Sequence, residues 1–116
     1  MREEAKEMKN MKMADVIIFN VGEEQYPQDY LGNVADIISA KIEKMECNVK
    51  GRFSVMNFSD AQKVADELKD TTADLFIINF LSWHITPNIM HIIKNHTDVP
   101  LLIWGIGGTT DKTGKL

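Results

Sequence analysis

The chain has few of the features that mark several classes of protein, beginning with cysteine. Cys47 is the only cysteine among 116 residues, which excludes an internal disulfide and a thiolate-rich zinc site. A lone thiol is a liability in an oxidising compartment, so a cytoplasmic location is favoured. The longest apolar runs, residues 16–19 and 101–106, are far shorter than the ~20 residues that a membrane helix requires, so no membrane partner is expected.

A surplus of positive charge is also missing. The sequence holds 13 Lys and Arg residues against 17 Asp and Glu residues, a formal net charge of −4. A phosphate backbone is usually bound by a basic patch, so no nucleic-acid partner is expected. Residues 1–13 mix charges of both signs and lack the apolar segment of a signal peptide, so we expect a charged, solvated leader that is prone to disorder.

Three short apolar runs have the length and the β-branched content of buried strands. They are residues 14–21, 74–80 and 99–104. Runs that are apolar on both faces are typical of a parallel sheet covered by helices. A fourth segment, residues 48–56, mixes Val49 and Phe53 with Lys50 and Arg52, which indicates an edge strand.

Three segments with helical spacing of apolar residues lie between these runs. The expected helix starts are Asp29 as a cap, a capping box from Ser59 to Gln62, and Thr86 followed by Pro87. The residues expected to face the sheet are Val34, Ile38, Ile42 and Met45, then Val64, Ala65 and Leu68, then Ile89, Met90 and Ile93.

This alternation predicts an α/β domain over residues 14–108 with a polar tail over residues 109–116. Right-handed crossovers make it a three-layer, flavodoxin-like, doubly wound parallel sheet with strand order 2-1-3-4. The fourth strand would then form one edge, although its run is among the most apolar in the chain. We therefore expect an architecture truncated after strand 4, whose open apolar edge pairs with another copy in a homo-oligomer or with missing domains.

Ligands of open α/β sheets bind beyond the carboxyl ends of the strands, which here are followed by residues 22–28, 81–85 and 105–113. Residues 22–27 lack the G-x-G-x-x-G pattern, and their two carboxylates would repel a phosphate. Residues 108–116 fail the phosphate-loop template at Thr109 and Leu116. Asn79 in place of Asp disfavours a receiver-type phosphoacceptor. A nucleotide- or flavin-binding protein is therefore disfavoured.

The titratable residues of these loops do not form a recognisable catalytic set. His84, His91 and His96 follow one another at spacings of seven and five, which match no common ligand pair, so solvent-facing or capping histidines and no metal are expected. Glu23 and Glu24 are loop neighbours, which more often point apart into water than share acid–base chemistry. No catalytic residue is predicted.

Trp83 stands apart because it follows the third predicted strand at the mouth of the expected cleft. Two interpretations of this residue stay open. The ring can pack over the third helix, or it can offer a flat apolar face to a ligand.

The segment around Trp83 resembles the N-terminal domain of the L-fucose and L-arabinose isomerase family. In arabinose isomerases the third strand leads into a Trp, a His-containing loop, a [Ser/Thr]-Pro-x-x-Met-x-Ile motif and a Pro-Leu-Leu strand. The corresponding residues here are Trp83, His84, Thr86, Pro87, Met90, Ile92, Pro100, Leu101 and Leu102. The loop after Trp83 is shorter than in the family. Residues 22–26 match the family motif G-S-Q-x-L-Y more loosely. The resemblance as a whole covers about residues 16–108.

Family enzymes interconvert aldoses and ketoses, usually with Mn²⁺ held by two carboxylates and a histidine of later domains. The resemblance implies that this chain corresponds to the substrate-covering and oligomerisation domain, which is inactive without the metal-binding domains. It also implies that Trp83 lies against the C–H face of a sugar or polyol, with Gln25, Tyr26 and His84 as further substrate-binding residues. The alternative is a stand-alone α/β module that binds a small molecule or regulates a partner.

Overall fold

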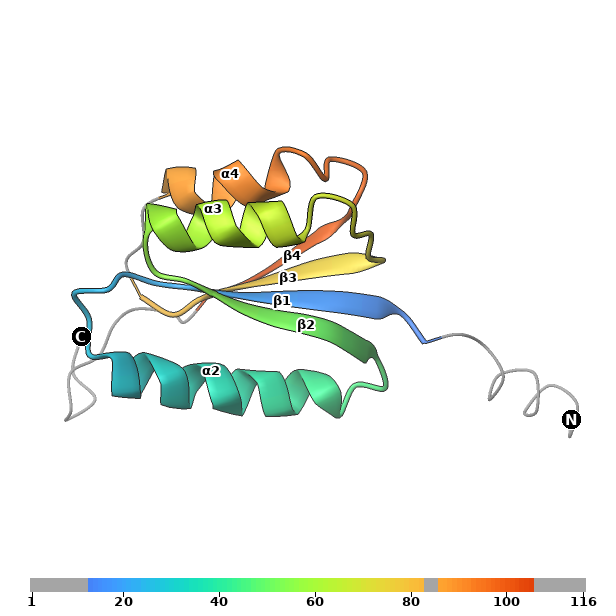
Figure 1. Cartoon of the computed structure of the whole chain (residues 1–116). Helices are drawn as coiled ribbons and strands as arrows, with labels where there is room; N and C mark the ends of the chain where they lie inside the picture. Colours follow the sequence, from blue (N-terminus) through green and yellow to red (C-terminus); the bar gives the residue numbers. More distant parts are fainter. Residues whose placement is uncertain (1–12, 83–85, 106–116) are drawn as a thin grey trace, which may run out of the picture.

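The computed structural model describes residues 13–82 and 86–105, in which strands and helices alternate along the chain (Figure 1). The strands are β1 (Asp15–Val21), β2 (Asn48–Val55), β3 (Leu75–Phe80) and β4 (Leu101–Gly105). The helices are α2 (Gln28–Glu43), α3 (Phe58–Glu67) and α4 (Thr86–Ile93). The predicted tail and, apart from Met13, the predicted leader lie outside the described residues.

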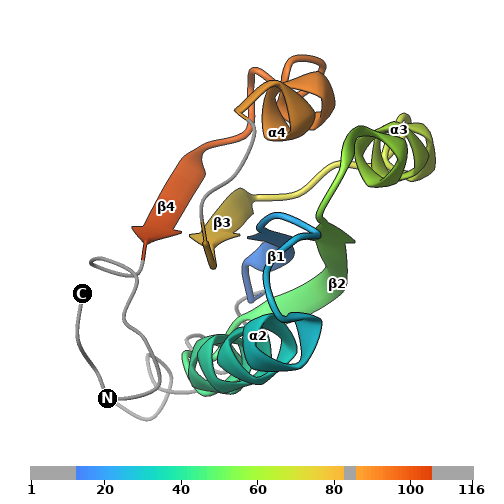
Figure 2. The same cartoon turned by 90° about the vertical axis from the view of Figure 1, so that its left-hand side faces the viewer.

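The strands form one parallel sheet in the order β2-β1-β3-β4. Helix α2 covers one face of the sheet, and α3 and α4 cover the other (Figure 2). This arrangement confirms the predicted flavodoxin-like α/β fold and its strand order. None of the described helices is both long enough and apolar enough to cross a membrane.

The buried side chains form one cluster on each face of the sheet. Since neighbouring residues of a strand point to opposite faces, β1 and β3 contribute to both clusters. On the face of α3 and α4 the largest members are Phe19 and Phe76, whose rings meet edge to face with centroids 5.1 Å apart. On the other face, Leu31, Ile38 and Ile42 of α2 pack against the sheet.

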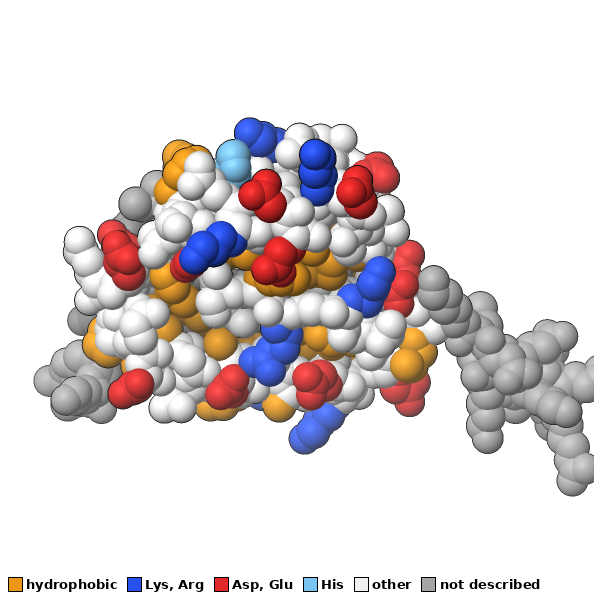
Figure 3. Space-filling view, viewed as in Figure 1, with side chains coloured by type: hydrophobic (Ala, Val, Ile, Leu, Met, Phe, Trp, Pro, Cys, Tyr) orange, Lys and Arg blue, Asp and Glu red, His pale blue; other side chains and the backbone are white. Residues whose placement is uncertain are grey.

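The two outer strands expose different side chains. In β2, the exposed positions include Lys50 and Arg52, and the pairing register shifts between Val16 and Ile17 of β1. Figure 3, which views the molecule from the β2 side, shows Lys, Arg, Asp and Glu side chains across this surface. In β4, Leu101, Leu102 and Ile103 are exposed, which confirms the expected apolar edge.

Two of the predicted helix starts are wrong. Helix α2 begins at Gln28 after Pro27, so Asp29 lies in the first turn and does not cap the helix. Its negative charge interacts favourably there with the positive end of the helix dipole. Helix α3 is capped by Asn57, whose side chain accepts a hydrogen bond from the Asp60 N–H at 2.7 Å.

Asp60 completes the cap of α3 because its carboxylate accepts the Met56 N–H at 3.0 Å. The two side chains that cap the helix are thus those of Asn57 and Asp60. They lie two residues before the predicted Ser59–Gln62 capping box. The packing of Ala61 and Val64 on the sheet, together with the extended backbone of Asn57, places the helix start there. Helix α4 begins at Thr86, one residue before the predicted first helical position.

Most of the helix positions predicted to face the sheet do so, but two methionines are exposed. Met45 is 62% exposed because α2 ends at Glu43, before the predicted stripe is complete. Met90 is 49% exposed because Ile89 and Ile92 form the buried side of α4.

Candidate functional site

The carboxyl ends of β1 and β3 form the candidate site because the chain leaves these neighbouring strands in opposite directions. From β1 it crosses to β2 at one edge, and from β3 it crosses to β4 at the other. In open α/β sheets ligands bind beyond the two strands at such a divergence, so this region is the candidate crevice. Residues 22–27 follow β1 at this point, and Leu81 and Ser82 follow β3.

Two hydrogen bonds join the end of β3 to the loop after β1. The Leu81 N–H donates to the Val21 carbonyl at 2.9 Å, and the Glu23 N–H donates to Ser82 Oγ at 3.2 Å. A side chain at Gly22 would meet Ser82 Oγ at 3.0 Å and Met56 Sδ at 3.1 Å. Glycine at this position therefore allows the loop to approach Ser82 closely.

Further hydrogen bonds hold the loop on its other side. The Gln28 side-chain amide donates to the carbonyls of Tyr26 at 2.9 Å and Glu23 at 3.2 Å. The Asn57 amide donates to the Glu24 carboxylate at 3.0 Å, which ties the loop to the start of α3. The loop is thus attached to three of the elements around it.

The structure describes two of the four predicted substrate-binding residues. Gln25 is exposed on the loop after β1, and Tyr26 is partly buried because it packs against the cluster under α2. Trp83 and His84 lie outside the described residues. Gln25 is therefore the available polar side chain of the two, while Tyr26 also contributes to packing.

A buried amide pair, missed by the sequence analysis, lies one residue below the ends of the two central strands. Asn20 and Asn79 are register partners, and Asn79 Nδ2 donates to Asn20 Oδ1 at 3.0 Å. Asn79 is fully buried, and among the described residues nothing donates to its Oδ1. The pair is a polar contact inside an otherwise apolar sheet, next to the candidate crevice.

The sequence does contain a signal for this pair. In both segments an Asp precedes an Asn by five residues, and the Asn lies one residue before the last position of the strand: Asp15 and Asn20 in the first, Asp74 and Asn79 in the second. Parallel strands aligned on this shared pattern bring the two amides together. The aspartates meet as well, because the Asp15 N–H donates to the Asp74 carboxylate at 2.7 Å.

Within residues 13–82 and 86–105, no group of three or more His, Cys, Asp and Glu side chains could hold a metal ion. His91 is partly buried and lies 5.0 Å from Phe58 between ring centroids. His96 is buried against Phe76, with ring centroids 5.4 Å apart, so the solvent-facing prediction is wrong for this residue. Its main chain closes the turn after α4, since its carbonyl accepts the Val99 N–H.

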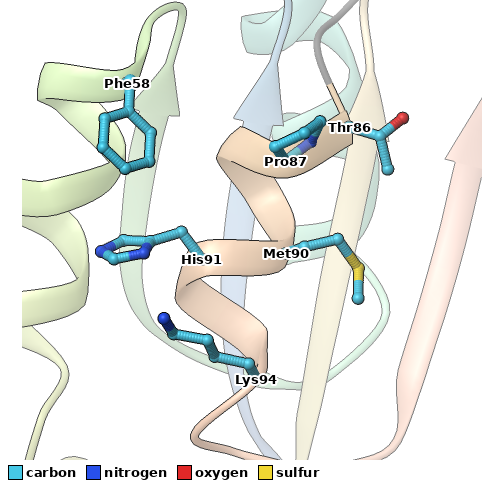
Figure 4. Close-up of a pocket in the computed structure, with 6 residues that line it drawn as sticks. All are labelled: Phe58, Thr86, Pro87, Met90, His91 and Lys94. Carbon is cyan, nitrogen blue, oxygen red and sulfur yellow. The ribbon is translucent and has the colours of Figure 1, made fainter.

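An open hollow of about 710 Å³ lies on the outer side of α3 and α4 (Figure 4). The side chains that line it are Phe58, Thr86, Pro87, Met90, His91 and Lys94. In Figure 4, Phe58 and His91 approach each other from the two helices, while Met90 points away from them. The hollow is lined by residues of α3 and α4 and by Lys94 directly after α4, and by none of the residues that follow β1 or β3 directly.

The structure thus comprises a flavodoxin-like α/β domain whose loop after β1 bears the exposed side chain of Gln25. The amide of this side chain can both donate and accept hydrogen bonds. Neither the models of known protein families nor the curated proteins provided a match to this chain. The functional interpretation therefore depends on the site and on the resemblance described above.

Proposed function

We propose that the chain is the substrate-covering domain of an aldose–ketose isomerase of the fucose/arabinose type. The observation that carries the proposal is the pair of hydrogen bonds between the β1 loop and the end of β3. They bring the loop that bears Gln25 and Tyr26 next to Ser82, the residue that precedes Trp83 in the chain. The residues to which the resemblance assigns sugar binding thus follow, in the chain, the ends of two neighbouring strands, β1 and β3.

The chemistry of a sugar suits this combination of residues. A sugar presents apolar C–H faces and many hydroxyls, so an aromatic ring beside an amide can bind both. In the proposal, Trp83 covers the C–H face, and Gln25, Tyr26 and His84 bind hydroxyls. The chain itself supplies no catalytic group, and Mn²⁺ belongs to the further domains of the complete enzyme.

Ligand-detected NMR with a panel of aldoses and polyols, with and without Mn²⁺, tests the proposal. We expect a member of the panel to bind without Mn²⁺ and Gln25→Ala or Trp83→Ala to weaken that binding at least tenfold. Gln62→Ala, which changes an exposed glutamine of α3, is the matched control and should leave binding unchanged. Circular dichroism verifies that each variant is folded.

Two results would contradict the proposal. One is the absence of binding to every sugar and polyol, which would show that the carboxyl ends of β1 and β3 do not form part of a sugar site. The other is binding that survives both Gln25→Ala and Trp83→Ala, which would place the sugar elsewhere on the domain.

A stand-alone small-molecule or regulatory module is the second candidate. It is favoured by one observation, that β1, β3 and the loop after β1, which border the candidate crevice, all belong to this chain. Binding of a ligand that is not a sugar, abolished by Gln25→Ala and not by Gln62→Ala, would support this candidate over the isomerase domain.

A further inference from the structure

The outer side of β4 lacks the devices with which proteins protect an open sheet edge. Leu101, Leu102 and Ile103 are 45%, 47% and 61% exposed, and β4 contains no charged residue and no proline. Among the described residues, no strand pairs with β4 on the side away from β3. Charged side chains, proline and bulges normally protect such an edge, because its free backbone groups can pair with another strand.

The backbone of β4 directs particular groups to this open side. The Phe76 N–H donates to the Pro100 carbonyl at 2.9 Å, so position 100 faces β3. Backbone groups of a strand alternate between its two sides, so position 102 also faces β3. Leu101 and Ile103 therefore present their N–H and C=O groups to the open edge.

We propose that β4 pairs antiparallel with β4 of a second copy, across a two-fold axis that passes between the two Ile103 residues. The two Ile103 residues then exchange N–H···O=C bonds, which is the pairing that their outward backbone groups allow. In the same register Leu101 lies opposite Gly105 of the partner strand, and Leu102 lies opposite Trp104. Each of these cross-strand pairs is apolar, and none sets like charges against each other.

The other edge of the sheet explains why the occupant is a second β4. Lys50 and Arg52 on β2 and the register shift beside them oppose pairing at that edge. The antiparallel β4 pair uses the same surface on both copies, so the assembly closes as a dimer. A contact between β4 and β2 would instead be heterologous and would build a ring or an open filament.

Helix α4 extends the apolar surface beyond the strand. Leu101 and Ile103 are register partners of Phe76 and Ile78, which belong to the cluster under α3 and α4, so they share that face. Met90, half exposed on α4, points toward the β4 side in Figure 4. A stable interface buries roughly 1,200 Å² or more, and Met90 of each copy offers apolar area beside the joined strands in addition to the strands themselves.

The pairing has a consequence for the candidate site. Because the two sheets run antiparallel, the crevices beyond β1 and β3 lie at opposite ends of the joined sheet. Neither crevice is covered by the pairing, so this inference is independent of the proposed sugar site.

Sedimentation equilibrium of the full chain tests the dimer, with Ile103→Lys as the disrupting variant. The substitution places two ammonium groups at the two-fold axis, so the dissociation constant of the dimer should rise at least tenfold. Met45→Lys is the matched control, since Met45 is as exposed as Ile103 but lies at the end of α2, and it should leave the constant unchanged. A wild-type monomer at millimolar concentration, an open-ended polymer, or a dimer unaffected by Ile103→Lys would each overturn the proposal.

Oxidative cross-linking tests the register in a chain that keeps an uncharged edge. In the Cys47→Ser background, Ile103→Cys places the two cysteines in a hydrogen-bonded antiparallel pair with Cα atoms about 5.5 Å apart, within disulfide range. We expect a covalent dimer from Ile103→Cys and none from Arg52→Cys, the control on β2. Cross-linking of Arg52→Cys, or none at Ile103→Cys in a chain that dimerises, would overturn the proposed register.

Discussion

Strands β2 and β4 occupy equivalent outer places in one parallel sheet, and they differ in almost every other respect. Along β2, exposed side chains alternate with partly buried ones, and Arg52 binds the Asp36 carboxylate of α2 at 2.9 Å. Along β4, Leu101, Leu102 and Ile103 are all exposed, although they point to both faces. β2 has the composition of an edge strand, whereas β4 has that of an interior strand.

The difference shows that apolar composition alone does not bury a strand. β1 and β3 are also rich in apolar side chains, and these are buried because each strand has a strand on both sides and helices above and below. β4 has a strand on one side only within the described residues. Its exposed side chains therefore contribute little to the stability of this domain and are available for a partner.

The largest effect on stability is expected at the centre of the sheet, where both outer strands are anchored through β1 and β3. Phe76→Ala removes a fully buried ring that contacts Phe19 and His96, so the free energy of unfolding should fall by about 3–5 kcal/mol. Urea unfolding measures it. Phe58→Ala, at an exposed phenylalanine of α3, is the control and should cost less than about 1 kcal/mol. Equal costs would show that the centre of the sheet is not its stable part.

A comparison of the two outer strands themselves should give a smaller effect. Val55→Ala at the buried end of β2 removes two methyl groups and leaves a cavity, so it should cost about 2 kcal/mol. Leu102→Ala on β4 removes more carbon but from a half-exposed side chain, so it should cost less than about 1 kcal/mol. Both are measured by urea unfolding at concentrations low enough to suppress self-association. A larger loss for Leu102→Ala would contradict the distinction between the two edges.

The turn from β2 into α3 distinguishes the observed cap from the predicted one. Asn57→Ala removes the side chain that accepts the Asp60 N–H, so it should lower the free energy of unfolding by about 1 kcal/mol. Ser59→Ala changes the residue that the sequence pattern favours as the cap, and we expect a change within about 0.5 kcal/mol. Thermal unfolding followed by circular dichroism measures both. The reverse order of the two effects would restore the predicted capping box.

The smallest effect is expected at the ion pair on the β2 edge. Arg52→Gln breaks the contact with Asp36, but both side chains are exposed to solvent, so the cost should be below about 0.5 kcal/mol. The difference from wild type should shrink further in 1 M salt, where the charges are screened. Lys63→Gln, at an exposed lysine of α3, is the control for the change in net charge. A cost above 1 kcal/mol that persists in high salt would assign the pair a structural role.

Much of the fold could be predicted because its signals are local. The apolar runs and the polar interruptions of residues 48–56 identify the strands, and the handedness of parallel crossovers leaves few possible orders. Helix starts were less predictable. Pro27 and Asn57 precede the observed helices, whereas Asp29 and Ser59 were expected as caps, because several adjacent residues can cap a helix. Packing on the sheet selects among them.

The candidate site was predictable only in its location. The rule for carboxyl ends of strands identifies the loop after β1, and the structure places Gln25 and Tyr26 on it. The contact between Glu23 and Ser82 joins residues 59 positions apart, and no sequence pattern indicates it. The pairing of Asn20 with Asn79, across the same separation, is indicated only by the Asp-to-Asn spacing that the two segments share. Both depend on the register of β1 against β3.

The sequence by itself determined which segments become strands and helices and that the strands form a parallel, doubly wound sheet. These features follow from hydrophobic periodicity and chain handedness, which act over a few residues or a single crossover. Only the tertiary structure decided that Met90 stays exposed while Ile92 is buried, and that the Asn79 amide meets Asn20. Such outcomes depend on which surfaces meet, because burial and pairing belong to a contact between segments and not to either segment alone.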